Sequence, residues 1–247
     1  MSDAHLWLYL FATLVGGLIS GLTGFAMGVV MASMWLHIIS PLQTATLILC
    51  FGFITLSHAI WTLRHALSWK TLAPYIYGGM VGAPLGVILL THVNPDVVRL
   101  CVGLLLVTYA LLNLLKPKLA TLQSGFAVDF AVGMVNGLVG GLTGLTGIII
   151  AIWCQMRGWP KDTQRMVFQP VNLMAIVFAA GSLAVTGSIA FETIQLFLYG
   201  LPLVVLGQWI GLRYYGKLND AAFRKLLLWL FLLTGIALVL PSLGLVK

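Results

Sequence analysis

Charged side chains are scarce in this chain of 247 residues, where only 8% of the residues are Asp, Glu, Lys or Arg. A soluble globular domain carries about 25% charged residues, so this sequence has too few charges to cover a surface that faces water. Hydrophobic residues make up 60% of the chain, and they must face lipid or one another. The composition therefore indicates an integral membrane protein with little soluble mass.

Acidic residues and cysteines are rarer still, with six and three in the whole sequence. The cysteines Cys50, Cys101 and Cys154 form no CxxC pair, which argues against a zinc site and a disulfide framework. No metal or other cofactor is expected. The HExxH and GxSxG motifs are absent, so an enzyme is not expected either.

The basic residues outnumber the acidic ones by 13 to 6, which gives a net charge of +7. Most of them lie between apolar runs, without a basic stripe and interleaved aromatics. This pattern is typical of charge that orients a protein in the bilayer. The expected partner is thus the lipid bilayer and not a nucleic acid.

Eight apolar segments are separated by short polar stretches, and most are near the roughly 20 residues that span a bilayer as a helix. Open strands are excluded because lipid cannot satisfy their edges. We therefore predict an all-α, polytopic fold of about eight helical segments. They cover approximately residues 6–36, 42–63, 72–91, 97–115, 126–156, 164–187, 193–213 and 224–241.

Two of these segments, Leu6 to Leu36 and Phe126 to Met156, are 31 residues long. A continuous helix of that length measures about 46 Å, whereas the hydrocarbon core is about 30 Å thick. Each contains a glycine cluster near its middle, and glycine weakens a helix interior. Each long segment is either one tilted helix or two short pieces broken at the glycines, so eight and ten membrane segments both stay open.

The two halves of the sequence resemble each other, which indicates a duplication. Gly21-Leu22-Thr23-Gly24 recurs as Gly141-Leu142-Thr143-Gly144. In the same order, Ser40-Pro41 is echoed by Trp159-Pro160, Tyr77-Gly78 by Tyr199-Gly200, Gly82 and Gly86 by Gly207 and Gly211, and Asn94 and Arg99 by Asn219 and Arg224. We predict a first membrane repeat over residues 1–115, a linker over 116–125 and a second membrane repeat over 126–247.

The distribution of basic residues distinguishes the two interpretations of the long segments, because Lys and Arg collect in cytoplasmic loops. If both long segments fold back and return to the side they came from, eleven basic residues lie on one side and two on the other. The two are Arg99 and Lys247; the eleven are Arg64, Lys70, Lys116, Lys118, Arg157, Lys161, Arg165, Arg213, Lys217, Arg224 and Lys225. Unbroken segments divide the same residues five to eight. The tally favours an odd number of crossings in each half, inverted repeats, a cytoplasmic linker and both termini outside.

The two glycine-threonine breaks are the best candidates for a solute site. A broken helix presents unpaired N–H groups near mid-membrane, and the positive end of a half-helix favours an anion. Thr23 and Gly24 in the first break, and Thr143, Gly144 and Thr146 in the second, are the residues expected to contact the solute. The alternative is that these glycines serve close helix packing.

Packing is the expected role of two further glycine pairs, Gly78 with Gly82 and Gly207 with Gly211, because they have the small-xxx-small spacing. Asp129, Glu192 and Arg99 lie at segment ends, where capping or interfacial anchoring is expected.

The segment near residue 170 is interrupted by Gln169-Pro170-Val171-Asn172. Pro170 removes a backbone hydrogen bond and should kink the helix. Gln169 and Asn172 are then candidates to line the solute path, with hydrogen bonding between helices as the alternative.

These glycine motifs resemble those of the sulfite exporter TauE/SafE family of membrane transporters. The likeness rests on the run from Gly17 to Gly28, the run from Gly137 to Gly147 and the later Ser40-Pro41, and it extends over nearly the whole chain. Two positions depart from the family pattern, since Ser33 and Ile148 stand where proline is common. The resemblance implies a multi-pass transporter of the bacterial inner membrane.

We therefore expect a secondary carrier of a small anion, such as sulfite, an organosulfonate or a small carboxylate. Alternating access would take place around a site between the two repeats. A passive anion channel on the same scaffold and a membrane scaffold subunit without transport are the alternatives. The substrate, the direction of transport, the coupling ion and a homo-oligomeric state are left open by the sequence.

Overall fold

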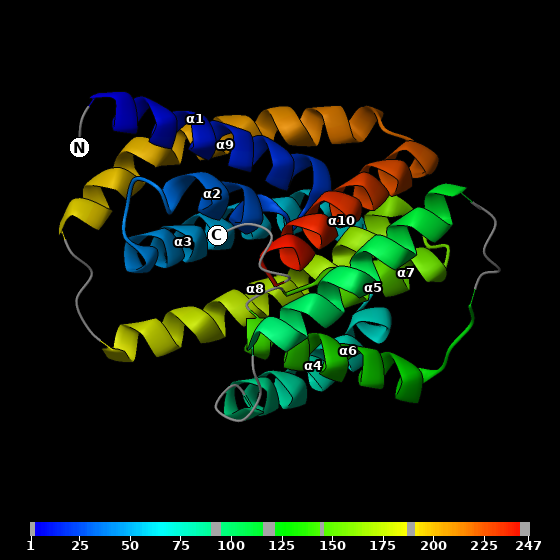
Figure 1. Ribbon diagram of the computed structural model, residues 1–247. Helices are drawn as coiled ribbons and strands as arrows, with labels where there is room; N and C mark the ends of the chain where they lie inside the picture. Colours follow the sequence, from blue (N-terminus) through cyan, green and yellow to red (C-terminus); the bar gives the residue numbers. More distant parts are fainter. Residues whose placement is uncertain (1–2, 90–94, 116–121, 144–145, 187–190, 243–247) are drawn as a thin grey trace. The chain divides into compact units, whose positions relative to one another are not determined.

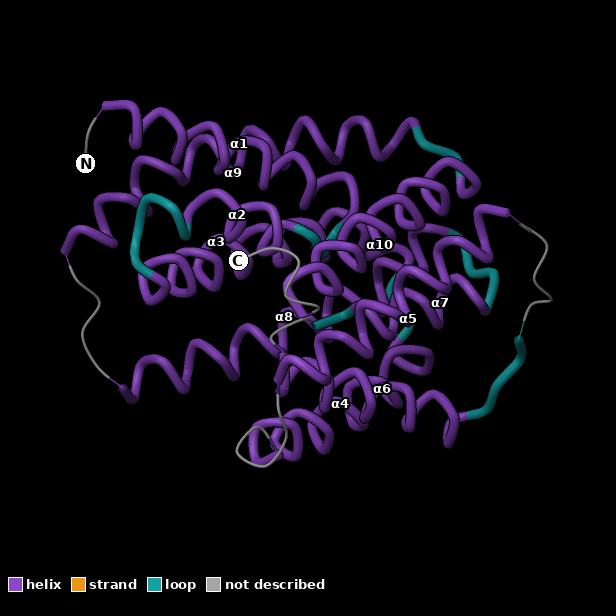
Figure 2. Tube along the Cα trace, viewed as in Figure 1, coloured by secondary structure: helices purple, strands orange, loops and turns teal. Residues whose placement is uncertain are grey.

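The computed structural model describes the chain except for residues 1–2, 90–94, 116–121, 144–145, 187–190 and 243–247 (Figure 1). All regular secondary structure of the described residues is helical (Figure 2), which confirms the predicted class. The helices are α1 (Asp3–Thr23), α2 (Met27–Trp35), α3 (Pro41–Leu63), the 3₁₀ turn η1 (Arg64–Ala66), α4 (Trp69–Leu89), α5 (Pro95–Leu115), α6 (Phe126–Thr143), α7 (Ile148–Met156), α8 (Lys161–Thr186), α9 (Phe191–Lys217) and α10 (Asp220–Ser242).

Both long segments are broken, so the eight apolar segments of the sequence become ten α-helices in the described part of the chain. The first divides into α1 and α2, and the second into α6 and α7. Among the described residues, four helical stretches are long and apolar enough to cross a membrane, namely Asp3–Thr23, Pro41–Ala66, Phe191–Lys217 and Asp220–Leu240; shorter apolar helices cover Leu100–Leu115 and Phe126–Leu142. This architecture fits a polytopic membrane protein.

The chain forms two compact units, and each combines helices from both sequence halves. Unit 1 comprises Met1–His65 and Asn172–Leu218, and unit 2 comprises Ala66–Val171 and Asn219–Lys247. The division falls within α8, between Val171 and Asn172. The predicted repeats at 1–115 and 126–247 are contiguous in the sequence and do not coincide with these two units. The repeats stay a prediction about a duplication of the sequence.

In unit 1, helices α1 and α9 lie side by side (Figure 1) because glycines bring their backbones close together. A Cβ atom added to Gly17 would meet the backbone of Val204, and one added to Gly21 would meet the Gln208 carbonyl. Gly211, in turn, faces the carbonyl of Leu18. Residue numbers rise together along the contact, so the two helices are parallel.

Helix α2 folds back along α1 in the same unit. The Trp35 ring, at the end of α2, stacks on the Tyr9 ring near the start of α1, with their centroids 5.0 Å apart. Midway, the Met31 side chain fills the space left by Gly16. Phe51 of α3 joins this buried apolar cluster. The first long segment is therefore a hairpin whose two ends lie near each other.

Helix α3 follows this hairpin with a complete N-terminal cap. The Ser40 hydroxyl accepts a hydrogen bond from the Gln43 N–H at 3.2 Å, and the Gln43 amide oxygen accepts from the Ser40 N–H at 3.1 Å. Pro41 occupies the first helical position, where its missing N–H costs nothing.

In unit 2, helices α4 and α6 pack in the same manner as α1 and α9. Gly78, Gly82 and Gly86 of α4 face the carbonyls of Phe130, Met134 and Leu138 in turn, so these two helices are also parallel. The packing role predicted for Gly78 with Gly82 and for Gly207 with Gly211 is confirmed, because a Cβ at any of the four would collide with its neighbours.

Helices α5 and α10 of unit 2 are antiparallel. Arg224 near the start of α10 donates a hydrogen bond to Asn113 near the end of α5, at 2.8 Å. Further along, the Tyr109 ring meets the Phe231 ring with centroids 6.3 Å apart. Gly103 lies against the carbonyl of Gly235 at the far end of this contact, so residue numbers run in opposite directions along the pair.

Candidate functional site

The first break joins α1 to α2 through Gly24. Its N–H donates to the Ser20 carbonyl at 2.8 Å, and its φ of 88° lies in the left-handed region that favours glycine. The next helix begins at Met27 without a side-chain cap. A helix start leaves N–H groups without intrahelical partners and carries a partial positive charge, so the start of α2 is suited to an anion.

Thr23 immediately precedes this break and is buried, with 1% of its surface exposed. Its hydroxyl donates to the Ile19 carbonyl one turn earlier, at 2.8 Å. The hydroxyl proton is thus engaged with the backbone in this conformation. To donate to a solute, the side chain must rotate away from Ile19.

The second break, between α6 and α7, differs from the first. Thr143 is the last residue of α6, while its side chain and the whole of Gly144 fall outside the described residues. Thr146 is half-buried, and Gly147 has a φ of 83°. Only part of this predicted contact set is therefore described.

Asn136 closes the second break from within, a role that sequence reasoning missed. Its side-chain oxygen accepts from the N–H groups of Gly147 and Ile150, at 3.1 and 3.5 Å. With 2% of its surface exposed, Asn136 is buried within α6. In the alignment of the two halves that pairs Gly21 with Gly141, Asn136 corresponds to Gly16. The sequence signal for this role was therefore a single Asn in a glycine-rich helix, at a position where the other half has glycine.

Gln169 and Asn172 lie on α8, on either side of Pro170, which the helix accommodates. Gln169 is fully buried and Asn172 is 4% exposed. The Asn172 side-chain oxygen is buried without a hydrogen-bond partner.

Arg165 is a second residue that the sequence analysis missed, since it was counted there only as a basic residue at a segment end. It is fully buried on α8. With the Gln169 amide oriented so that its oxygen faces the guanidinium, Nη2 and Nε of Arg165 donate to that oxygen at 2.8 and 3.2 Å. The structure thus joins a buried positive charge to one of the predicted site residues.

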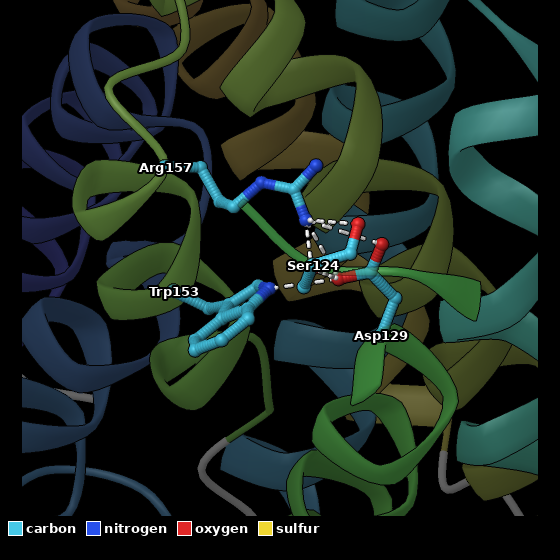
Figure 3. A network of polar contacts seen from close by, with 4 residues as sticks. All are labelled: Ser124, Asp129, Trp153 and Arg157. Carbon is cyan, nitrogen blue, oxygen red and sulfur yellow. Dashed lines mark hydrogen bonds and ion pairs between the residues drawn. The ribbon is translucent and has the colours of Figure 1, made fainter. Parts of the chain in front are cut away.

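A polar network ties the start of α6 to the end of α7 (Figure 3). Asp129 pairs with Arg157 at 3.1 Å and accepts from the Trp153 indole N–H at 3.0 Å. The Ser124 hydroxyl donates to Asp129 at 2.7 Å, and Arg157 also contacts Ser124. Asp129 lies in the first turn of α6, so it anchors this helix end as its position predicted, and the second long segment folds back like the first.

A cavity of about 580 Å³ opens in unit 1 beside the start of α1, the α2–α3 connection and the start of α9. Polar side chains at its wall include His37, Gln43, Glu192 and Gln195. Among the predicted site residues that the structure describes, none lines this cavity.

Comparison with protein-family models gives a match to the sulfite exporter TauE/SafE family over residues 9–238. Comparisons with curated proteins and with solved structures give no match. The matched range includes most of α1 and α10 and the whole of α2 to α9, and so covers both broken segments almost completely. The chain therefore belongs to the sulfite exporter TauE/SafE family, and it is a multi-pass membrane transporter and not an enzyme.

Proposed function

We propose that the protein is a secondary carrier of a small anion, with sulfite, an organosulfonate or a small carboxylate as the candidate solutes. The family supplies the solute class. The observation that carries the proposal is the buried break at Gly24, where α2 starts without a side-chain cap. Neutral N–H donors at such a helix start are suited to binding an anion.

The proposed contacts are Thr23 and Gly24 at the first break, Thr143, Gly144 and Thr146 at the second, and Gln169 and Asn172 on α8. The first break is the better candidate for binding the anion, because at the second break Asn136 already accepts hydrogen bonds from two of the N–H groups at the start of α7. Gln169 and Asn172 add two amide side chains that are buried within the protein.

We further propose that the two halves are inverted repeats. Helices α5 and α10 hold equivalent places in the halves, and the matches of Asn94 with Asn219 and Arg99 with Arg224 support that equivalence. Equivalent helices run antiparallel when a repeat is inverted, and the hydrogen bond from Arg224 to Asn113 supports that direction. An inverted repeat is a common scaffold for alternating access.

The hairpins α1–α2 and α6–α7 fit this topology. Each returns near the point where it began, as the contacts of Tyr9 with Trp35 and of Asp129 with Arg157 indicate. Each half then crosses the membrane an odd number of times, which agrees with the eleven-to-two distribution of basic residues. We place the linker at 116–125 in the cytoplasm and the protein in a bacterial inner membrane.

The test is a thermal-shift screen of purified protein in detergent against sulfite, methanesulfonate, acetate and chloride, followed by flux measurements in proteoliposomes. A carrier should be stabilised by its solute through binding to the folded state and should show saturable flux. Single-channel currents that rise linearly with voltage would indicate a passive channel instead. Absence of both stabilisation and flux for every anion would indicate a scaffold subunit and contradict the proposal.

A further inference from the structure

We propose that Arg64, Arg213 and Lys217, at the ends of helices α3 and α9, bind the headgroup of an anionic phospholipid. These three residues are called here the basic end of unit 1, to which both helices belong up to these residues. The inference goes beyond the proposed function, because it concerns the surrounding membrane and does not depend on which solute is carried.

The two helices that carry the basic end run parallel to each other. The Phe51 ring of α3 stacks on the Phe197 ring of α9, with centroids 5.2 Å apart. Further along, the Gln208 side chain of α9 donates a hydrogen bond to the Thr55 carbonyl of α3. Residue numbers therefore rise together along this contact, and the two helices end on the same side of unit 1.

The three cations lie at nearly the same level beyond that contact. Arg64 follows Thr55 by nine residues, and Lys217 follows Gln208 by nine residues. At 1.5 Å per residue, each lies about 13 Å past the hydrogen bond between the helices. Arg213 lies one helical turn before Lys217. The cations thus share one end of unit 1.

The charged side chains of unit 1 are segregated between its two ends. In residues 1–65 and 172–218 the acidic side chains are Asp3 and Glu192, and the Lys and Arg side chains are those of the basic end. Asp3 lies in the first turn of α1 and Glu192 in the first turn of the parallel helix α9. The acidic residues of the unit therefore lie at the end opposite the cations.

Each cation of the basic end is exposed and lies over an exposed aromatic ring of its own helix, one turn earlier. The pairs are Arg64 on Trp61 at 4.1 Å, Arg213 on Trp209 at 5.3 Å and Lys217 on Tyr214 at 5.6 Å from the ring centroid. Exposed Trp and Tyr rings at the ends of membrane spans lie at the level of the lipid headgroups. The three pairs therefore place positive charge at that level.

The N–H groups of these cations are available to a ligand. Within the described part of the chain, the three side chains have no carboxylate partner and donate no hydrogen bond. Asp220, the acidic residue that follows Lys217 most closely in the sequence, accepts a hydrogen bond from the Lys161 N–H at 2.9 Å. A cation that lies over a ring face keeps its N–H groups for charged oxygens.

A phosphate headgroup matches this surface in charge, in donors and in position. Arg and Lys form charge-assisted hydrogen bonds with phosphate oxygens, and clusters of basic residues beside membrane spans attract anionic lipids. Pro41–Ala66 and Phe191–Lys217 are both long and apolar enough to cross a membrane, so their ends reach the headgroups. A soluble phosphate lacks the acyl chains that can contact the exposed rings, which favours the lipid.

The experiment measures lipid binding by the thermal stability of the purified full-length protein in a neutral detergent. Phosphatidylglycerol is titrated as the anionic lipid, phosphatidylcholine as the zwitterionic lipid and glycerol phosphate as the soluble headgroup. The test variant combines Arg64→Gln with Arg213→Gln. The matched control combines Lys70→Gln with Lys225→Gln, because both are exposed cations of unit 2 and their loss changes the net charge equally.

We expect phosphatidylglycerol to stabilise the wild-type protein more than the other two compounds. The half-saturating phosphatidylglycerol concentration should rise about tenfold in the test variant and should stay close to wild type in the control. High salt should weaken the binding to wild-type protein, because exposed charges are screened. This last measurement needs no variant.

Three results would overturn the inference. They are equal weakening in the test variant and the control, stabilisation by phosphatidylcholine or glycerol phosphate that matches phosphatidylglycerol, and phosphatidylglycerol binding that is indifferent to salt. None of these measurements contains a transported solute, so a negative result here is distinct from a failure of the proposed anion transport.

Discussion

Arg224, in the second turn of α10, donates a hydrogen bond to Asn113, near the last turn of α5, at 2.8 Å. This contact sets the two helices antiparallel. If α5 and α10 are equivalent helices of the two sequence halves, as proposed above, their opposed directions support the proposed inverted repeats. In the same pair, a Cβ added to Gly103 would meet the Gly235 carbonyl, and one added to Gly235 would meet the Gly103 carbonyl.

Inverted repeats predict that the linker and the N-terminus lie on opposite sides of the membrane. In a background where Cys50 and Cys101, both exposed, are replaced by alanine, Gln123→Cys should react with a membrane-impermeant maleimide only after the cells are opened. His5→Cys should react in intact cells. If both positions react from the same side, each half crosses an even number of times and the inverted repeat is wrong.

Close glycine packing between α1 and α9 predicts a sharp difference between two alanine substitutions on one helix. At Gly207 a Cβ would collide with the Leu14 carbonyl, whereas at Gly216 it would meet nothing within 4 Å. Gly207→Ala should lower stability by about 1–3 kcal/mol, as overpacking does, and Gly216→Ala should be neutral or stabilising. Thermal unfolding in detergent measures both, and equal melting temperatures would rule out the proposed contact.

The cap at the second break predicts a cost for losing the Asn136 oxygen. Asn136→Leu leaves the N–H groups of Gly147 and Ile150 without their acceptor, and an unsatisfied buried donor costs about 1–3 kcal/mol. The melting temperature should fall accordingly. Val135→Leu, at the neighbouring exposed position, is the control and should behave like wild type; a similar loss in both variants would show that the cap is unimportant.

Thr23 at the first break predicts a transport defect without a folding defect. Thr23→Val keeps the side-chain shape but removes the hydroxyl, so sulfite flux should fall about tenfold, the equivalent of about 1.4 kcal/mol. Thr62 makes the same backward bond, from its hydroxyl to the His58 carbonyl at 2.8 Å, in an exposed position. Thr62→Val is therefore the matched control, and normal kinetics in Thr23→Val would remove this threonine from the site.

The sequence predicted the helical class, the two breaks and the packing role of the glycine pairs outside them. These features follow from local chemistry, since apolar length sets the spans and glycine weakens helices. The left-handed backbone at Gly24 and Gly147 shows why glycine is needed where each hairpin turns. The sequence could not predict which helix each glycine pair packs against, because Met134, the partner of Gly82, and Leu14, the partner of Gly207, are distant along the chain.

Arg165 and Asn136 were missed for a different reason. An arginine five residues into a helix has the same sequence signature whether it faces water or the protein interior, and only tertiary packing buries it. Asn136 acts on a helix that begins twelve residues later, so its role depends on how the hairpin closes. In both cases the sequence offered only a weak signal: Arg165 lies four residues before Gln169, and Asn136 lies four residues before Gly140.

The central claim, that the protein carries a small anion, is tested most directly by sulfite counterflow. Proteoliposomes loaded with unlabelled sulfite are diluted into a trace of ³⁵S-sulfite under nitrogen. A carrier predicts a transient accumulation of label above the external concentration, and protein-free liposomes should show none. If the label never exceeds equilibrium for sulfite, methanesulfonate or acetate, the account of this protein as an anion carrier is contradicted.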